Sequence, residues 1–379
     1  MLPGPQGSDF ALQDFASDVG VVRLRRDVGR SFVSMLATGR QIDHGGDNVV
    51  IGPDFQWRPR AGDSVTGQAL YSRSRTPRRP DLADEWDGRT LSDRAAQLSW
   101  SHNTRRLDWY LQGQDIGREF RADNGFIPQV GYREAYSQAG YTFRPKDTFL
   151  SRVRVFTENF YDREPGGHAL TQRLSVGSGM DGKWNSFLRV ELDRDNFRVG
   201  DRWLQRFRPR LMIQASPGSF VNQFSIDSYV GGEVDFANGR EGKGTTVLTS
   251  FTLRPGPHLE LRGNADRRSL NVHPASGPAG RVFTATVERL RATWSFNSRA
   301  FIRLIGQYVV TRRDTALYAF TVPAKTAGLS ASGLFAYKLN WQTVLYTGYG
   351  DARQFDEVSD RLQKSGRQAF AKVSYAWQH

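Results

Sequence analysis

The sequence predicts an all-β fold: a transmembrane up-and-down antiparallel β-barrel of about 20 strands, with short periplasmic turns and long extracellular loops. Three observations support this prediction. Most of the chain alternates between polar and apolar residues with a period of two. Many predicted strands have about 12–16 residues, well beyond the usual five or six of globular strands. Short and long connections alternate along the chain, as they do in outer-membrane barrels.

Composition narrows the class of protein. The chain has 379 residues, no Cys, a net charge of +13 and a mean hydropathy of −0.55. Without Cys, neither a disulfide framework nor a thiolate metal site can form. No run approaches the roughly 18 apolar residues of a transmembrane helix. The first residues, MLPGPQGSDF, lack the basic and apolar regions of a signal peptide.

Nineteen strands are predicted, separated by stretches rich in Gly, Asn, Asp and Pro. The stretch HLELRGNAD is typical, because Leu259 and Leu261 share one face while Glu260 and Arg262 share the other. Strands of this length suit a tilted crossing of a bilayer. In order, the strands are expected at residues 19–26, 31–41, 48–58, 64–75, 94–102, 106–116, 130–143, 148–161, 168–180, 183–196, 202–215, 219–236, 242–254, 258–271, 281–296, 299–313, 327–339, 342–350 and 367–377.

The connections between these strands favour a membrane barrel over other all-β folds. Turns after odd-numbered strands are short, such as DVGR, RPKD and RPGP. Long polar loops follow several even-numbered strands, at residues 76–92, 117–129, 272–280, 314–326 and 351–366. A sandwich or propeller has no reason to keep this parity, and no repeat indicates propeller blades. We therefore expect the short turns in the periplasm and the long loops outside the cell.

Charged residues are predicted to line the lumen. In RFRPRLMIQ, residues 206–214, arginines occupy every second position and apolar residues take the opposite parity. In a closed barrel the first set faces water and the second faces lipid. The predicted lumen-lining residues are Arg152, Arg154, Glu158, Arg189, Glu191, Asp193, Arg206, Arg208, Arg210, Glu260, Arg262, Asp266 and Arg303. Eight arginines against five acids leave this set net positive by three, which predicts a preference for anions.

Aromatic residues gather near the predicted periplasmic ends. An interfacial girdle is expected from Trp57, Phe143, Trp184, Phe220, Phe296, Phe301 and Trp341. In the last strand Val373, Tyr375 and Trp377 share one face, the amphipathic pattern that outer-membrane assembly machinery reads; an ordinary final strand has the same pattern. Pro209 interrupts a strand and indicates a local bulge, because proline has no N–H to pair.

Two regions are predicted. Residues 19–379 form the barrel, and residues 1–18 form an N-terminal segment that is either a loop or the end of a truncated upstream region. Bacterial single-chain barrels have an even number of strands and both ends in the periplasm. An odd count of nineteen, together with the missing signal peptide, therefore predicts further chain upstream.

Four segments carry a family resemblance: DVGRSFVSMLATGRQ, DNVVIGPDFQWRP, TVLYTGYGD and QAFAKVSYAWQ. Together they resemble the C-terminal barrel domain of unknown function that follows a family-nine carbohydrate-binding module in Gram-negative envelope proteins. The resemblance implies an outer-membrane barrel with a signal peptide and a binding module before it. It supplies no catalytic residues.

Other functional classes have weaker support. GDSV at residues 62–65 is similar to the serine block of some lipases, but Asp-Ser is also ordinary turn chemistry. The acidic loop with Asp81, Asp84, Glu85 and Asp87 could bind calcium, but a solvated acidic surface loop is the favoured interpretation. Basic residues spread over nearly every strand argue against a nucleic-acid module. The six histidines have no metal-ligand spacing; they are His44, His102, His168, His258, His273 and His379.

The sequence therefore predicts a pore or transporter for polar solutes, anionic or saccharide-type, in the bacterial outer membrane. Its expected partners are outer-membrane lipid and lipopolysaccharide, the barrel assembly machinery and the solute. No enzyme activity, cofactor, metal or nucleic acid is expected. The alternative is a structural anchor or export barrel for a missing N-terminal carbohydrate-binding module, without transport of small solutes.

Overall fold

Nineteen long strands dominate the described part of the chain in the computed structural model, which covers residues 2–4, 7–9, 15–43, 45–82, 84–273 and 277–377. Strands β1 (Leu2–Gly4) and β2 (Gly7–Asp9) form a short antiparallel hairpin. A 3₁₀ helix, η1, spans Thr315–Leu317. No helix in the described ranges is long and apolar enough to cross a membrane. The long strands are β3 (Ser17–Val28), β4 (Ser31–Ile42), β5 (Asp47–Trp57), β6 (Asp63–Arg75), β7 (Thr90–Asn103), β8 (Leu107–Ile116), β9 (Tyr132–Phe143), β10 (Leu150–Arg163), β11 (Ala169–Gly182), β12 (Ser186–Val199), β13 (Arg202–Ala215), β14 (Val221–Asp235), β15 (Arg240–Leu253), β16 (Leu259–Val272), β17 (Gly280–Ser295), β18 (Ala300–Arg313), β19 (Lys325–Lys338), β20 (Thr343–Asp356) and β21 (Arg361–Tyr375).

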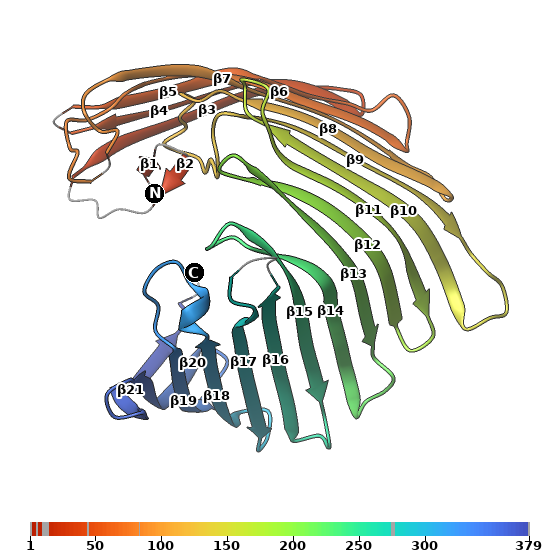
Figure 1. Cartoon of the computed structure of the whole chain (residues 1–379), viewed down its shortest axis with the longest axis vertical. Coiled ribbons are helices and arrows are strands. Elements are labelled where there is room, and N and C mark those ends of the chain that lie inside the picture. Colours follow the sequence, from red (N-terminus) through yellow and green to blue (C-terminus); the bar gives the residue numbers. More distant parts are fainter. Residues whose placement is uncertain are drawn as a thin grey trace. The chain divides into compact units, whose positions relative to one another are not determined.

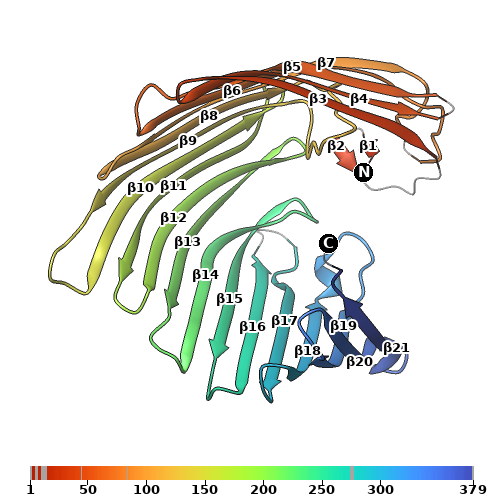
Figure 2. The same ribbon diagram turned by 180° about the vertical axis from the view of Figure 1, so that it is seen from behind.

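The long strands form an antiparallel up-and-down sheet whose strand order follows chain order. The chain divides into two compact units. Unit 1 comprises Met1–Thr142, Val155–Ser175 and Asp195–Arg198, and unit 2 comprises Phe143–Arg154, Val176–Arg194 and Val199–His379. Strands β3 to β9 pair in sequence in unit 1, and β13 to β21 do so in unit 2. Figures 1 and 2 show each set side by side.

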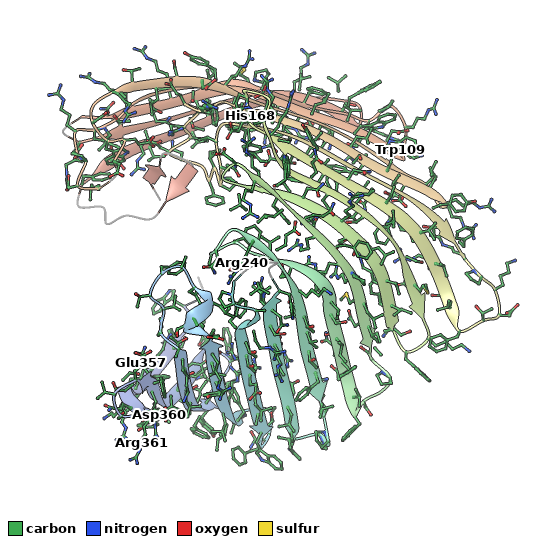
Figure 3. All side chains as sticks on the ribbon, in the orientation of Figure 1. Trp109, His168, Arg240, Glu357, Asp360 and Arg361 are labelled. Carbon is green, nitrogen blue, oxygen red and sulfur yellow. The ribbon has the colours of Figure 1, made fainter. Side chains whose placement is uncertain are left out.

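The predicted antiparallel strands are confirmed, but the long loop expected at residues 351–366 is wrong. Strand β20 continues to Asp356 and β21 begins at Arg361, leaving only residues 357–360 as a turn. Figure 3 labels Glu357 and Asp360 at this turn. Pairing continues close to it, with Phe355 opposite Leu362. A strand end that is polar on both faces lacks the period-two alternation, so its sequence pattern is that of a loop.

Short and long connections alternate only in part. Connections after odd-positioned strands are all short, from residues 29–30 to residues 144–149. After even-positioned strands, long loops occur at 76–89, 117–131 and 314–324. The loop expected at 272–280 shrinks to 273–279, and β12 is joined to β13 by residues 200–201 alone. Three long loops therefore remain in the described chain.

Strand β13 separates polar from apolar side chains. In β13, Arg206 and Arg210 form ion pairs on one face, while Phe207 and Leu211 are exposed on the other. The regular pairing of β13 with β14 runs from Arg210 to Ala215 and stops beside Pro209. This matches the interruption expected at the proline.

Exposed aromatic side chains lie near the short-turn ends of strands. The expected set is found there with one exception: Trp57, Phe143, Trp184, Phe220, Phe296 and Trp341 are exposed. The expectation for Phe301 is wrong. Phe301 shares the parity of Arg303, whose guanidinium carbon lies 5.1 Å from the centroid of the Phe301 ring. Since β18 begins at Ala300, Phe301 and Arg303 both lie in this strand, two residues apart. Phe301 therefore belongs to the polar face.

Gly52 marks a close approach between β5 and β6. A Cβ atom there would overlap the carbonyl oxygen of Ala69, and regular pairing is interrupted between Ile51 and Asp54. We expect Gly52→Ala to lower the free energy of unfolding by about 1–3 kcal/mol, because the backbone must shift. Urea unfolding in detergent micelles measures this. Gly20→Ala is the control, since its Cβ would meet open space; equal losses in both variants would contradict the close approach.

Candidate functional site on the polar face

A buried carboxylate gathers arginines on the polar face of unit 2. Arg206 Nη1 lies 2.9 Å from Glu233 Oε1, and Arg208 Nη1 lies 3.7 Å from Glu233 Oε2. Arg268 of β16 approaches the same oxygen at 3.8 Å. A buried carboxylate is stable only when it is paired and hydrogen-bonded. Glu233 therefore neutralises part of the arginine charge that the sequence places in this region.

Arg210 belongs to a second network beside the first. Its guanidinium lies 2.7 Å from Asp227 and 3.3 Å from Glu191, and Glu191 also pairs with Arg189 at 2.7 Å. The ring of Tyr229 lies 5.0 Å from the Arg210 guanidinium carbon. Arg208 stacks on the same ring at 4.2 Å. A planar guanidinium held by carboxylates and an aromatic face has little freedom to move.

The other predicted residues fall into smaller groups. Glu260 accepts hydrogen bonds from Arg262 and Arg254, with nitrogen–oxygen distances of 2.7 and 2.8 Å. Arg152 pairs with Asp181. Two of these partners, Arg254 and Asp181, are absent from the lumen-lining set predicted from the sequence.

Other predicted positions lie on β10, β12 and β16. Glu158 accepts a hydrogen bond from Gln138 in unit 1 at 3.2 Å. Asp193 of β12 is buried. Asp266 of β16 takes the parity of Arg262. Arg154 lies in β10 of unit 2.

The predicted net charge of the polar face needs revision. Three acids missing from the predicted set, Asp181, Asp227 and Glu233, each pair with one of its arginines. Adding them to the predicted set leaves it neutral. Four further arginines were also missed, and with them the enlarged set is net positive by four: Arg254, Arg268, Arg289 and Arg291. The alternation in VERLRAT, residues 287–293, was the signal for the last two.

The polar face of unit 1 is rich in amides and hydroxyls. Gln97 of β7 donates to Gln112 of β8 at 3.2 Å, and Gln112 donates to Glu134 of β9 at 3.2 Å. The Tyr110 hydroxyl donates to Gln112 at 2.6 Å, and Gln114 donates to the Tyr132 hydroxyl at 3.0 Å. Amides and hydroxyls both donate and accept hydrogen bonds. This face therefore suits neutral polar groups.

The loop 117–131 folds over the polar face of unit 1. Its Phe120 is buried against Val50 of β5. Asn48, fully buried, donates to the carbonyl of Arg121 at 3.0 Å and accepts from the N–H of Asp123 at 3.1 Å. The N–H of Arg121 donates to Ser72 of β6 at 3.0 Å. Side chains of two strands thus satisfy the loop backbone.

A buried ion pair joins this loop to the loop 76–89. Arg121 makes a bidentate contact with Glu85, at 3.1 Å from Nε and 2.7 Å from Nη2. The side chains are 5% and 6% exposed. Trp86 of the second loop is buried against Ile42 and Phe15. The two loops are therefore fixed to each other and to the strands of unit 1.

A third loop folds back in unit 2. Leu317, in the connection 314–324, is buried with Leu270, Val272 and Val282 of β16 and β17. Arg240, labelled in Figure 3, donates to the carbonyl of Leu317. All three long loops in the described chain thus carry a buried apolar anchor.

Burial raises the pKa of Asp123 to about 6, although Arg40 and Arg121 favour its charged form. The folded loop therefore favours the protonated carboxyl. This stabilisation is complete below about pH 4 and is lost as the pH rises through about 6. We expect slower hydrogen exchange of residues 117–131 at pH 5 than at pH 7.5, after correction for intrinsic rates. Asp123→Asn should abolish the difference; a persisting difference would assign the effect to another group.

Catalytic and calcium readings gain no support. His102 Nδ1 lies 2.8 Å from Asp63 Oδ1, and the His102 ring stacks on that of Trp109, which Figure 3 labels, with the ring centroids 3.8 Å apart. Asp63 and His102 lie on the face that exposes Leu98. Ser64, the next residue after Asp63, lies on the opposite face. No Ser–His pair arises from GDSV.

In the acidic loop, arginines form ion pairs with two of the carboxylates. Asp81 pairs with Arg79, and Asp87 pairs with Arg89. Their hydrogen bonds lower the pKa of both acids. In the described ranges, no group of three His, Asp or Glu side chains is placed to hold a metal. His44 and His379 lie outside those ranges.

The fold is similar to that of siderophore receptors. The siderophore receptor PirA from Acinetobacter baumannii matches with a TM-score of 0.54 and 9% identity, covering 98% of this chain and 73% of that one. PirA from Pseudomonas aeruginosa matches with a TM-score of 0.53 and 9% identity, covering 96% and 70%. No protein-family model matches the sequence, and no curated protein matches it. At this identity the likeness shows the fold alone.

Proposed function

We propose that this chain is an outer-membrane β-barrel that passes polar solutes through a lumen narrowed by inward-folded loops. The separation of faces carries the proposal. On the apolar face Leu98, Leu290 and Leu304 are exposed, although each is large and aliphatic. An apolar surface that extends over many strands requires an apolar partner. Lipid is that partner, provided that the sheet closes so that no strand edge meets hydrocarbon.

The proposed location is the bacterial outer membrane, with lipid and lipopolysaccharide around the barrel. Val373 and Tyr375 of β21, with Trp377 just after it, are exposed. Tyr375 and Trp377 meet edge to face, with ring centroids 6.1 Å apart. This supports their proposed recognition by the barrel assembly machinery.

The solute is proposed to be polar and hydroxyl-bearing, and anionic in preference. Unit 1 offers the amides and hydroxyls around Gln112. Unit 2 offers fixed guanidinium groups such as Arg210. No reaction is proposed.

A second candidate is a structural anchor or export barrel for an upstream module. The loops fixed by Phe120, Trp86 and Leu317 favour it, because they fill space over the polar face. The resemblance to the barrel that follows a family-nine carbohydrate-binding module also favours it, and kinship with that family stays a prediction.

Planar-bilayer recording tests the proposal. We expect steady conductance with an anion preference that weakens as salt screens the arginine charges. Cation preference would overturn the charge argument. A folded, inserted protein without conductance would favour the anchor or export role.

A further inference from the structure

A group of arginines on β16, β17 and β18 carries little compensating charge. Arg262 and Arg291 lie directly opposite each other on neighbouring strands. Like charges at such positions destabilise a sheet. Arg262, Arg289 and Arg303 all repel Arg291, while Glu260 attracts it. Two arginines, however, already occupy Glu260.

Within the described residues, Arg289, Arg291 and Arg303 have no ion pair. We call these three the arginine patch. Arg303 and Thr293 are directly opposite in register, and Arg291 precedes Thr293 by two residues, so all three side chains share one face. Arg289 lies opposite Asn264 of β16 and Gln307 of β18, so its direct neighbours on this face are two amide side chains. None of the residues directly opposite Arg289, Arg291 or Arg303 on the neighbouring strands is a carboxylate.

Buried polar atoms of the patch and of the neighbouring Thr293 are unsatisfied in the described chain. Arg291 Nε, Thr293 Oγ1 and Arg303 Nε are buried without a hydrogen-bond partner. Such atoms are rare in native proteins, because each costs the desolvation of a polar group. Three of them on two adjacent strands indicate a surface shaped for an external acceptor. Guanidinium groups favour carboxylate and phosphate oxygens.

A recess adjoins the patch. Its volume is about 360 Å³, and its lining includes Ile305, Ser332, Gly350, Gln368 and the ion-paired Asp351 and Arg367. Ile305 lies opposite Arg291 and Ser332 and two residues after Arg303 on β18, so the recess begins beside the patch. The glycine leaves space, and the serine and glutamine side chains supply donors and acceptors. A volume of this size holds a small molecule.

We propose that the arginine patch and this recess form a binding site for a hydroxylated organic anion. Its carboxylate or phosphate group contacts Arg291 and Arg303, and its hydroxyl groups contact Ser332 and Gln368. The inference deepens the proposed function, and it rests on that function for solute access to the polar face. The site itself exists in the folded chain whether or not the barrel conducts.

Calorimetric titration of the purified full chain in detergent tests the site. The probes are gluconate, glucose 6-phosphate, inorganic phosphate and glucose. We expect gluconate and glucose 6-phosphate to bind, phosphate to bind more weakly and glucose not at all. Binding of glucose as tight as that of gluconate would overturn the role of the arginines. Equal affinity for phosphate and glucose 6-phosphate would overturn the role of the recess, and no binding at all would overturn the site.

Variants assign the contacts. Arg291→Gln with Arg303→Gln should weaken gluconate binding at least about tenfold, since hydrogen bonds to charged groups have that magnitude. Ser332→Ala with Gln368→Ala should weaken gluconate binding and leave phosphate binding unchanged. Arg267→Gln is the matched control, because Arg267 follows Asp266 on the opposite parity of the same strand. A control loss equal to that of the arginine pair would reduce the effect to net charge and contradict the site.

Bilayer conductance measured on the same preparations separates the two proposals. Binding without conductance would refute the pore and keep the site. Conductance without binding would refute the site and keep the pore.

Discussion

Leu98→Arg is expected to lower the free energy of unfolding by about 2–4 kcal/mol, whereas Gln97→Arg should cost far less. Leu98 lies near the middle of β7 and is 55% exposed on the apolar face, opposite Gly67 and Gly113. In the proposed barrel an arginine there enters hydrocarbon. Gln97, the preceding residue, lies on the polar face, where an arginine meets water and neighbouring amides.

Urea unfolding in phospholipid vesicles measures both variants of β7. The two changes add the same side chain to adjacent positions, so strand propensity and chain length cancel in the comparison. Only the face differs. Small and equal effects at Leu98 and Gln97 would show that the apolar face does not meet lipid.

Arg121→Met is expected to destabilise the two long loops of unit 1 by about 3–5 kcal/mol, because it leaves the buried Glu85 carboxylate without its partner. Glu85→Leu combined with Arg121→Met should cost much less, since no buried charge remains. Hydrogen exchange of residues 76–89 and 117–131 measures the local stability. In a bilayer, the single variant should also show more frequent conductance changes as the loops open.

The double variant separates the contribution of charge pairing from the contribution of side-chain packing. If both variants loosen the loops equally, packing rather than charge pairing holds them. Asp81→Asn is a control on the surface of the same loop, because its partner Arg79 is partly exposed and the pair is solvated. Loosening by this change would contradict the assignment to Glu85 and Arg121.

Strands could be predicted from the sequence because alternation is local. Leu259, Glu260 and Leu261 show their faces without any knowledge of their neighbours. Alternation is lost within residues 351–366, where the polar ends of β20 and β21 have the same sequence pattern as a loop. Phe301 was misassigned for a related reason: clustering near a turn does not define a face, whereas parity with Arg303 does.

The loop anchors could not be predicted. Phe120 and Trp86 are isolated apolar residues in polar segments, which is a weak signal for burial, and Leu317 is one of several apolar residues in its loop, so the sequence does not single it out. Their partners depend on register between distant segments; Asn48 and Arg121, for example, are 73 residues apart in sequence. Register also decided the charge balance, since parity alone shows which face Arg262 takes but not that Arg291 stands opposite.

The most direct test of a polar lumen within a lipid-facing wall is single-cysteine labelling along β7. The chain has no native Cys, so each variant carries one reactive site. In vesicles, a membrane-impermeant maleimide should label Gln97→Cys and Ser99→Cys but not Leu98→Cys, giving a period of two along the strand. A lipid-dissolved quencher should act in the reverse order on fluorophores attached there. Uniform labelling of all three positions by the impermeant reagent would contradict the membrane barrel.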